Sequence, residues 1–292
     1  MTKDEAYRII KRFNQNDNPS KNDEFMYIEA SSFLLETCDD KVIARDLGGY
    51  YYEKEKYDLA EKYYLIADRL GDFYAPIGLG YIYYYGRNGE KNFEKAFYYY
   101  NKAKDYNDEA CLKIADMYHN GYGVLKDDKK YKKILFNLLK KNKNSDNPSS
   151  IIPEISHRIA SIYIKEGKPD DAISILNKGY RFIKARLSYH TFWGNYIIAR
   201  RIVTMLYELV EYDKEDISFM DLFYVLRTPK KVIFHYNLKD YLIESFIDND
   251  NLYVKCEDKY YKSIEDFLIK HTFSKAHTGY IDFYEYFTIE EL

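Results

Sequence analysis

Histidine, cysteine and carboxylate side chains are the first residues to consider for chemistry in this sequence of 292 residues. The six histidines are scattered, and no cysteine or carboxylate stands at metal-ligand spacing beside His119 or His157. We therefore expect no metal site and interpret these histidines as surface side chains. Toward the C-terminal end, His235, Glu244 and Cys256 are residue types that suit catalysis, but the alternation of side chains in predicted strands leaves open whether they share a face.

Sequence motifs of the common catalytic and cofactor sites are absent from the chain. It contains no GxxxxGKS or GxxxxGKT phosphate loop, no HExxH zinc motif, no GxSxG motif and no glycine-rich dinucleotide turn. The pair Gly121 and Gly123 falls in register with the repeat described below, so we interpret it as a structural loop. We predict that the chain is not an enzyme and that it binds no cofactor.

The charge balance argues against a dedicated nucleic-acid-binding protein. Lysine and arginine number 44 against 47 aspartates and glutamates, which gives a formal net charge of −3. No stretch has the apolar character of a signal peptide or approaches the roughly 18 apolar residues that cross a membrane. The three cysteines are far apart and odd in number, as expected for buried thiols in a reducing compartment. We predict a cytoplasmic protein that binds neither membranes nor nucleic acid.

A pattern of large, small and aromatic residues recurs four times between residues 42 and 179. Each copy contains a Leu-Gly or Ile-Ala pair, and successive pairs are 32, 35 and 45 residues apart. The longest interval contains the polar stretch NKNSDNPSS, which we interpret as an insertion between units. A fixed period of this length is typical of helical repeat proteins. The four pairs are Leu47-Gly48, Leu79-Gly80, Ile114-Ala115 and Ile159-Ala160.

The small residues indicate where neighbouring helices approach closely. Glycine in an exposed helix interior costs about 1 kcal/mol relative to alanine, so glycine at these positions favours close packing against another helix. Ala60, Ala96 and Ala172 suit the same purpose on the second helix of each pair, and Tyr83 and Tyr100 fall at packing positions. Each unit is therefore predicted to be a helical hairpin that buries its apolar face by stacking on its neighbours.

This pattern resembles the Sel-one-like repeats, which are relatives of the tetratricopeptide repeats. The unit that begins at Ala75 departs from the family at Asn88, which replaces a loop glycine, and the next unit departs at Tyr131, which replaces an alanine. The resemblance implies an α/α superhelical solenoid of antiparallel helix pairs that acts as an adaptor for proteins or peptides and has no catalytic residues. The matching residues are Ala75, Leu79, Gly80, Tyr83, Gly86, Lys95, Ala96, Tyr100, Lys102 and Ala103, followed by Tyr118, Gly121, Gly123, Val124, Asp127 and Lys130.

The chain divides into four predicted parts. Residues 1–41 contain a pair of helices that we interpret as an N-terminal cap, and residues 42–180 carry the repeats. Residues 181–228 contain a long apolar helix over residues 189–212 and a shorter helix at residues 219–226. Residues 229–292 form a small β-β-β-α module with strands at 231–236, 241–247 and 252–256, and a helix capped by Ser263. The acidic, aromatic end is expected to be a disordered tail or to lie against another surface.

The face of the first helices is the candidate binding site, because in the tetratricopeptide pattern these helices line a concave groove. Three tyrosines on one face suit an extended peptide, although each of them also suits packing between repeats. We predict a scaffold that binds a protein or peptide. The alternative is a regulatory sensor whose solenoid binds a signal peptide and whose C-terminal module gives the output. The face carries Arg45, Tyr52, Tyr74, Tyr81, Tyr84, Asp116, His119, His157, Ser161 and Lys165.

Overall fold

The structure is a computed structural model that describes residues 1–143, 151–189, 193–211, 217–236, 239–270 and 286–291. It is mainly helical, with a small antiparallel sheet near the C-terminal end, as the sequence predicts. The chain forms two compact units, Met1–Ile134 and Leu135–Leu292, and each of them is described by itself.

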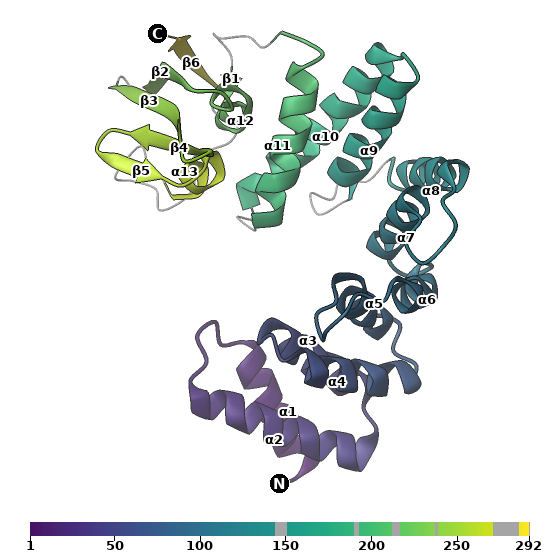
Figure 1. Cartoon of the computed structure of the whole chain (residues 1–292). Coiled ribbons are helices and arrows are strands. Elements are labelled where there is room, and N and C mark those ends of the chain that lie inside the picture. Colours follow the sequence, from purple (N-terminus) through teal and green to yellow (C-terminus); the bar gives the residue numbers. More distant parts are fainter. Residues whose placement is uncertain (144–150, 190–192, 212–216, 237–238, 271–285, 292) are drawn as a thin grey trace. The chain divides into compact units, whose positions relative to one another are not determined.

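The first unit is a succession of antiparallel helix pairs (Figure 1). Consecutive helices from α1 to α7 pack on one another along the chain, which confirms the predicted helical hairpins. The last helix, α8, continues past the boundary of the unit. The helices are α1 (Lys3–Asn14), α2 (Lys21–Cys38), α3 (Lys41–Glu53), α4 (Tyr57–Arg69), α5 (Ala75–Tyr85), α6 (Phe93–Ala103), α7 (Asp108–Asn120) and α8 (Asp128–Lys141).

Polar side chains begin these helices where the sequence provides them. Thr2 and Glu5 form a capping box at α1, and Ser20 and Asp23 form another at α2. In a capping box each side chain accepts a hydrogen bond from the backbone N–H of the other residue, which satisfies two donors that the helix leaves open. Asn107 caps α7 by accepting a hydrogen bond from the backbone N–H of Ala110.

Glycines end the first helix of both central pairs. Gly86 and Gly121 follow α5 and α7 with φ angles of 64° and 73°, a left-handed backbone that favours glycine. Gly123 also has a positive φ, and a Cβ atom there would lie 2.4 Å from the carbonyl oxygen of Phe93. The Gly-x-Gly pair therefore forms a tight loop between α7 and α8 that rests on the start of α6.

Tyrosine rings fill the space above the helical glycines. The ring of Tyr64 in α4 lies against both Gly48 in α3 and Gly78 in α5, so one side chain packs two successive first helices together. Tyr100 in α6 covers Gly80 in the same way and is fully buried. The sequence predicted close approach at Gly48 and Gly80, and the structure shows that aromatic rings make it.

The helices of the second unit begin with α9 (Ile152–Lys165), α10 (Pro169–Tyr189) and α11 (Trp193–Tyr207). Arg186 in α10 forms an ion pair of 2.7 Å with Glu154 in α9. The helix predicted over residues 189–212 is shorter in the structure, because Tyr189 ends α10 and α11 ends at Tyr207. Residues 190–192 and 212 lie outside the described residues. The 3-10 helix η1 (Phe219–Asp221) and α12 (Leu222–Val225) form the predicted short helical segment.

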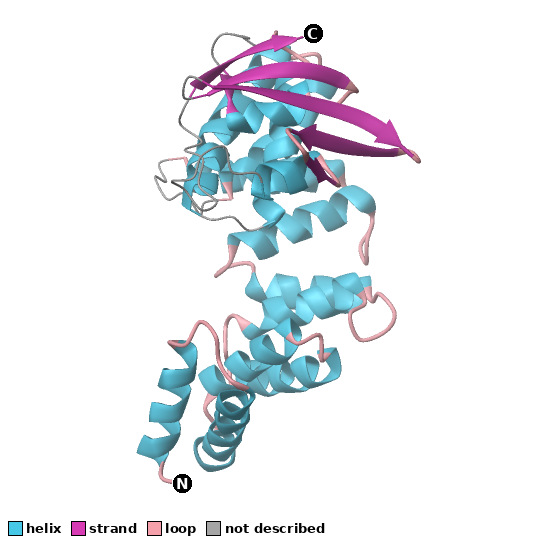
Figure 2. Ribbon diagram, turned by 90° about the vertical axis from the view of Figure 1, so that its left-hand side faces the viewer, coloured by secondary structure: helices cyan, strands magenta, loops and turns pink. Residues whose placement is uncertain are grey.

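The sheet contains the three predicted strands in the predicted antiparallel order and further strands on both sides of them (Figure 2). The helix α13 (Ile264–Lys270) follows, with the backbone N–H of Asp266 donating to the Ser263 hydroxyl as predicted. The strand order is β1-β6-β2-β3-β4-β5. The strands are β1 (Ile217–Ser218), β2 (Lys230–Tyr236), β3 (Lys239–Asp248), β4 (Asn251–Cys256), β5 (Lys259–Tyr261) and β6 (Tyr286–Glu291).

Of the two alternatives for the end of the chain, a disordered tail is wrong for residues 286–291, since these residues form β6 and lie against β1 and β2. Phe234 in β2 is paired with Ile289, and Phe287 is paired with Ile217 in β1. Without this strand, β2 would present an open edge, and an aromatic and β-branched segment suits such a position. Residues 271–285 lie outside the described residues.

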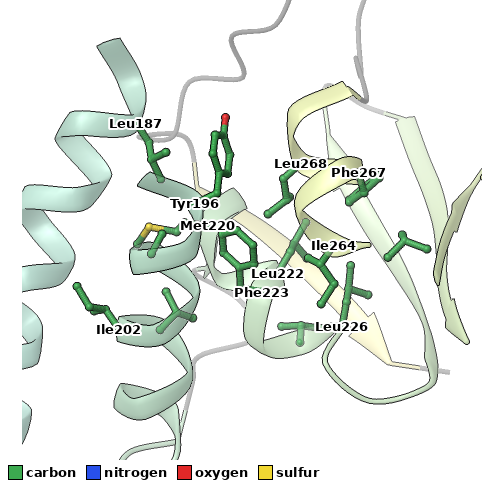
Figure 3. Close-up of a cluster of buried hydrophobic side chains, with 14 of the residues drawn as sticks. Leu187, Tyr196, Ile202, Met220, Leu222, Phe223, Leu226, Ile264, Phe267 and Leu268 are labelled. Carbon is green, nitrogen blue, oxygen red and sulfur yellow. The ribbon is translucent and has the colours of Figure 1, made fainter. Parts of the chain in front are cut away.

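One apolar core joins the helices and the sheet of the second unit. Side chains of Tyr196 in α11, Phe223 in α12 and Ile264 in α13 gather in a single buried cluster (Figure 3). Val232 and Ile243 contribute to it from the inner face of the sheet. The predicted burial of all three cysteines is confirmed for Cys256, which belongs to this core, whereas Cys38 and Cys111 are partly exposed.

Candidate partner-binding surface

Three tyrosines of α5 surround a lysine of α7. Tyr84 and Tyr85 follow Tyr81 by three and four residues, about one helical turn, so their rings lie on neighbouring parts of one helix face. The Nζ atom of Lys113 lies 5.7, 5.3 and 5.1 Å from the three ring centroids, respectively. It also donates a hydrogen bond of 2.7 Å to the hydroxyl of Tyr85. The lysine is therefore held by cation–π attraction and by a hydrogen bond.

A second cation contacts Tyr85 from the loop after α5. The guanidinium carbon of Arg87 lies 5.4 Å from the centroid of Tyr85 and 5.6 Å from that of Tyr57. A hydrogen bond to the hydroxyl of Tyr52 in α3 raises the pKa of Arg87. Tyr85 is 41% exposed, so both cations lie beside an accessible aromatic ring.

We call this set of residues the tyrosine surface; it comprises Tyr52, Tyr81, Tyr84, Tyr85, Arg87 and Lys113. It belongs to the first helices α3, α5 and α7 and the loop after α5, which follow one another along the first unit (Figure 1). The sequence prediction placed Tyr52, Tyr81 and Tyr84 on this face. It missed Tyr85, although the spacing of four residues from Tyr81 signals a shared helix face. It also missed Arg87 and Lys113, for which the repeat pattern gives no signal.

Tyr81 and Tyr84 serve packing as well as the surface. Tyr81 is half-buried, and burial together with the nearby carboxylate of Glu109 raises its pKa. Its ring meets the edge of Tyr100 at 5.9 Å. Tyr84 packs edge-on against Phe93 with a centroid distance of 5.5 Å. Inter-repeat packing, one of the two alternatives left open by the sequence, therefore applies to these two tyrosines, and their role in a groove stays a prediction.

Arg45 and Tyr74 form a neighbouring contact. Arg45 is ion-paired with Asp46 at 2.9 Å and with Asp72 at 3.2 Å, and its guanidinium carbon lies 5.8 Å from the ring centroid of Tyr74. Asp72 also accepts hydrogen bonds from the backbone N–H groups of Tyr74 and Ala75, so it caps α5. Tyr74 is 54% exposed and is the most accessible tyrosine of the predicted set.

The other predicted residues fall in two groups. His119 stacks on Tyr131 at 4.5 Å, and its Nδ1 atom lies 2.8 Å from a carboxylate oxygen of Asp128. Asp116 is half-buried in α7 near His119. His157, Ser161 and Lys165 belong to α9 of the second unit, where the Ser161 hydroxyl donates to the carbonyl oxygen of His157 at 3.0 Å. The role of all ten residues in partner binding stays a prediction.

The sheet does not bring His235, Glu244 and Cys256 together. Cys256 is buried and is paired in register with the buried Ile243, whereas Glu244 is directed to the opposite face. On that outer face Glu244 pairs with Lys231 at 3.4 Å, and His235 pairs with Asp240 at 2.6 Å. The three residues therefore do not form a catalytic set.

Two features are absent from the described part of the chain. There, no group of three histidine, cysteine, aspartate or glutamate side chains lies close enough to hold a metal ion. Likewise, none of the described helices combines the length and the apolar character needed to cross a membrane.

Comparison with known sequences identifies the central units. The profile of the Sel1 repeat matches residues 75–105 and 108–130, which correspond to the hairpins around α5 and α6 and around α7 and the start of α8. The chain carries Sel1 repeats. Solenoids built from such repeats are generally scaffolds for protein–protein interaction. No curated protein sequence matches the chain.

Two solved structures are similar to this Sel1 repeat chain. One is a Sel1 repeat protein from Oxalobacter formigenes, at 18% identity and a TM-score of 0.49, with 73% of this chain and 80% of that one covered. The other is a protective antigen of uropathogenic Escherichia coli with an SLR fold, at 18% identity and a TM-score of 0.45. That alignment covers 71% of this chain and 53% of the antigen.

Proposed function

We propose that the chain is a non-catalytic scaffold and that the tyrosine surface of its first unit binds a partner polypeptide. The observation that carries this proposal is the position of Tyr85, an exposed ring on a first helix that is flanked by Lys113 and Arg87. Aromatic rings and arginine side chains are the groups that contribute most to protein interfaces. Tyrosine also offers a large contact area at a low cost in conformational entropy.

The remainder of the tyrosine surface supports an interface rather than a catalytic site. Tyr52 and Arg87 both contact Tyr57, which lies beside the surface, and Lys113 contacts Tyr81 and Tyr84. These side chains are therefore already ordered before a partner arrives. Ordered side chains lose little further freedom on binding, which favours affinity. The proposal includes a cytoplasmic location, which the three separate cysteines support.

The test is capture of partners by the full-length chain from a lysate of its own organism, followed by mass spectrometry. The variant pair is Tyr85→Ala and Tyr98→Ala. Tyr98 is 58% exposed on α6, a second helix, so its substitution removes a similarly accessible ring from outside the tyrosine surface. We expect Tyr85→Ala to release the captured partner and Tyr98→Ala to retain it.

Equal retention by both variants, with unchanged helicity, would contradict the assignment of the tyrosine surface. Loss of the partner with Tyr98→Ala alone would move the interface to the second helices.

A further inference from the structure

We propose that Arg87, Tyr85 and Lys113 together bind a carboxylate group in an acidic segment of the partner polypeptide. This inference rests on the proposed scaffold function and specifies the chemistry of the partner. It follows from the charges and the hydrogen-bond donors of the tyrosine surface and from the position of the nearby Glu109.

Positive charge gathers around Tyr85. Lys113 interacts with Tyr81, Tyr84 and Tyr85, and among the described residues it forms no ion pair with a carboxylate. The contacts of Arg87 within the described ranges are likewise with tyrosines, not with a carboxylate. Two uncompensated positive charges therefore flank one exposed ring. By contrast, three cations of the first unit are ion-paired, namely Arg45 with Asp72, Lys54 with Glu24 and Lys102 with Asp68.

The same position is rich in hydrogen-bond donors. Lysine only donates, so the hydroxyl of Tyr85 must accept the hydrogen bond from Lys113. This hydroxyl then keeps its own proton to donate. The guanidinium and ammonium groups also have further N–H donors. The complement of such a cluster is an acceptor-only group, and a carboxylate is the acceptor-only side chain of polypeptides.

An acidic residue near Lys113 on α7, Glu109, interacts with Tyr81. Glu109 lies one turn before Lys113, and burial together with its carboxylate raises the pKa of the Tyr81 hydroxyl. Glu109 is thus engaged on the Tyr81 side of Lys113, while Arg87 contacts the Tyr85 ring. The uncompensated positive charge is centred on Tyr85.

The experiment measures binding of labelled peptides to the full-length chain by fluorescence anisotropy. The probe is an acetylated and amidated peptide of alternating glutamate and leucine, and its partner has glutamine in place of glutamate. Blocked ends ensure that only side-chain carboxylates are tested. We expect the glutamate peptide to bind at least about tenfold more tightly than the glutamine peptide, with an affinity that falls as salt is added.

The protein variants locate the site. The double substitution Arg87→Gln and Lys113→Gln is expected to reduce affinity for the glutamate peptide about tenfold and to remove most of its salt dependence. The matched control is Lys62→Gln. The Nζ atom of Lys62 also lies over a tyrosine ring, 5.4 Å from the centroid of Tyr63, but on α4, a second helix. This control should bind as the unsubstituted chain does.

Three results would overturn the inference. The first is equal affinity for the glutamate and glutamine peptides, which includes no binding of either peptide. The second is unchanged affinity of the double variant for the glutamate peptide, and the third is tighter binding of a lysine–leucine peptide by Lys113→Gln. The third would mean that Lys113 occupies a site for a cation. If Tyr85→Ala releases the captured partner but the double variant retains it, the scaffold function stands and the carboxylate site is rejected.

Discussion

A Cβ atom placed on Gly48 would lie 2.6 Å from Cδ1 of Tyr64, a distance that side chains do not tolerate. A Cβ atom on the next residue, Gly49, would lie 3.7 Å from the Tyr64 hydroxyl, which is an ordinary van der Waals contact. Two adjacent glycines in one helix therefore have different reasons to be there. The first makes room for a ring that connects successive repeats, and the second has ordinary space around it.

Substitution of these glycines gives the first prediction. Gly48→Ala should lower the free energy of unfolding by about 1–3 kcal/mol, because Tyr64 has to move away from α3 and α5. Gly49→Ala should be neutral or raise it by up to about 1 kcal/mol, since alanine favours the helix. Urea unfolding followed by circular dichroism measures both. Equal effects of the two substitutions would show that the ring is not fixed against Gly48.

The second prediction concerns the hydrogen bonds of Asp221. Its buried carboxylate accepts hydrogen bonds from the Tyr180 hydroxyl at 2.9 Å and from the backbone N–H of Ser218 at 2.7 Å. Burial raises the pKa of Asp221. Tyr180→Phe should reduce the free energy of unfolding by about 1–2 kcal/mol, because a buried acceptor loses one donor.

The control for this network is Tyr63→Phe, which removes a hydroxyl from a half-buried ring of the first unit. Urea unfolding should show no more than a few tenths of a kcal/mol for this variant, within the usual range for such changes. A loss as large as that of Tyr180→Phe would contradict the assigned role of the Asp221 hydrogen bonds.

The third prediction is a loss of stability at alkaline pH. Burial raises the pKa of Tyr64 from 10.0 to about 12, and burial raises that of Tyr261 to about 12 as well. The unfolded chain releases these protons at lower pH than the folded chain does. The stability that these buried, protonated tyrosines contribute to the folded state is therefore complete below pH 10.0 and is lost as the pH rises toward about 12.

Tyrosinate absorbance and far-ultraviolet circular dichroism, recorded together during an alkaline titration, test this prediction. Late tyrosine ionisation should coincide with loss of helicity. If all tyrosines ionised near their ordinary pKa while the helices remained, the burial of these rings would be wrong.

The fourth prediction is a decrease in helicity at acid pH that starts from the N-terminal helices. Hydrogen bonds from Thr2 lower the pKa of Glu5 below its ordinary value of 4.5, and hydrogen bonds from Ser20 lower that of Asp23 below 3.8. These capping boxes stabilise the helices fully above the ordinary values. The stabilisation is lost as the pH falls through the lowered pKa values.

Amide hydrogen exchange at decreasing pH, resolved by mass spectrometry, can locate this change. Protection of α1 and α2 should decrease before that of α5 and α6. In the double variant Thr2→Ala and Ser20→Ala, the protection of α1 and α2 should no longer show this earlier decrease as the pH falls. Persistence of the earlier decrease in this variant would contradict the role of the caps.

The repeats could be predicted from the sequence because packing restricts their residue types. Gly48 and Gly80 lie in helix interiors only because a ring covers each of them, so their spacing reveals the hairpins. Ala60 and Ala96 are fully buried for a related reason, as small residues where helices meet. The turns at Gly86 and Gly121 require positive φ, which also restricts the residue type.

The tyrosine surface was only partly predictable because surface contacts do not impose a repeat pattern. Lys113 is one of many lysines in the sequence, and nothing in its spacing indicates three surrounding rings. Arg87 lies in a loop, where the helix periodicity that placed Tyr81 does not apply. The strand β6 was missed for a similar reason, since its partner β2 is distant in the sequence and local patterns do not report such pairing.

The place of β6 in the sheet has a consequence for biosynthesis. This strand lies between β1 and β2, yet it is made after every other strand. The helices of the first unit and the strands β2 to β5 therefore emerge from the ribosome before β6, and until then the edge of β2 has no neighbouring strand. The first unit can fold during translation, whereas the second completes its sheet only when residues 286–291 have emerged. Until then the open edge of β2 is available for pairing with strands of other chains.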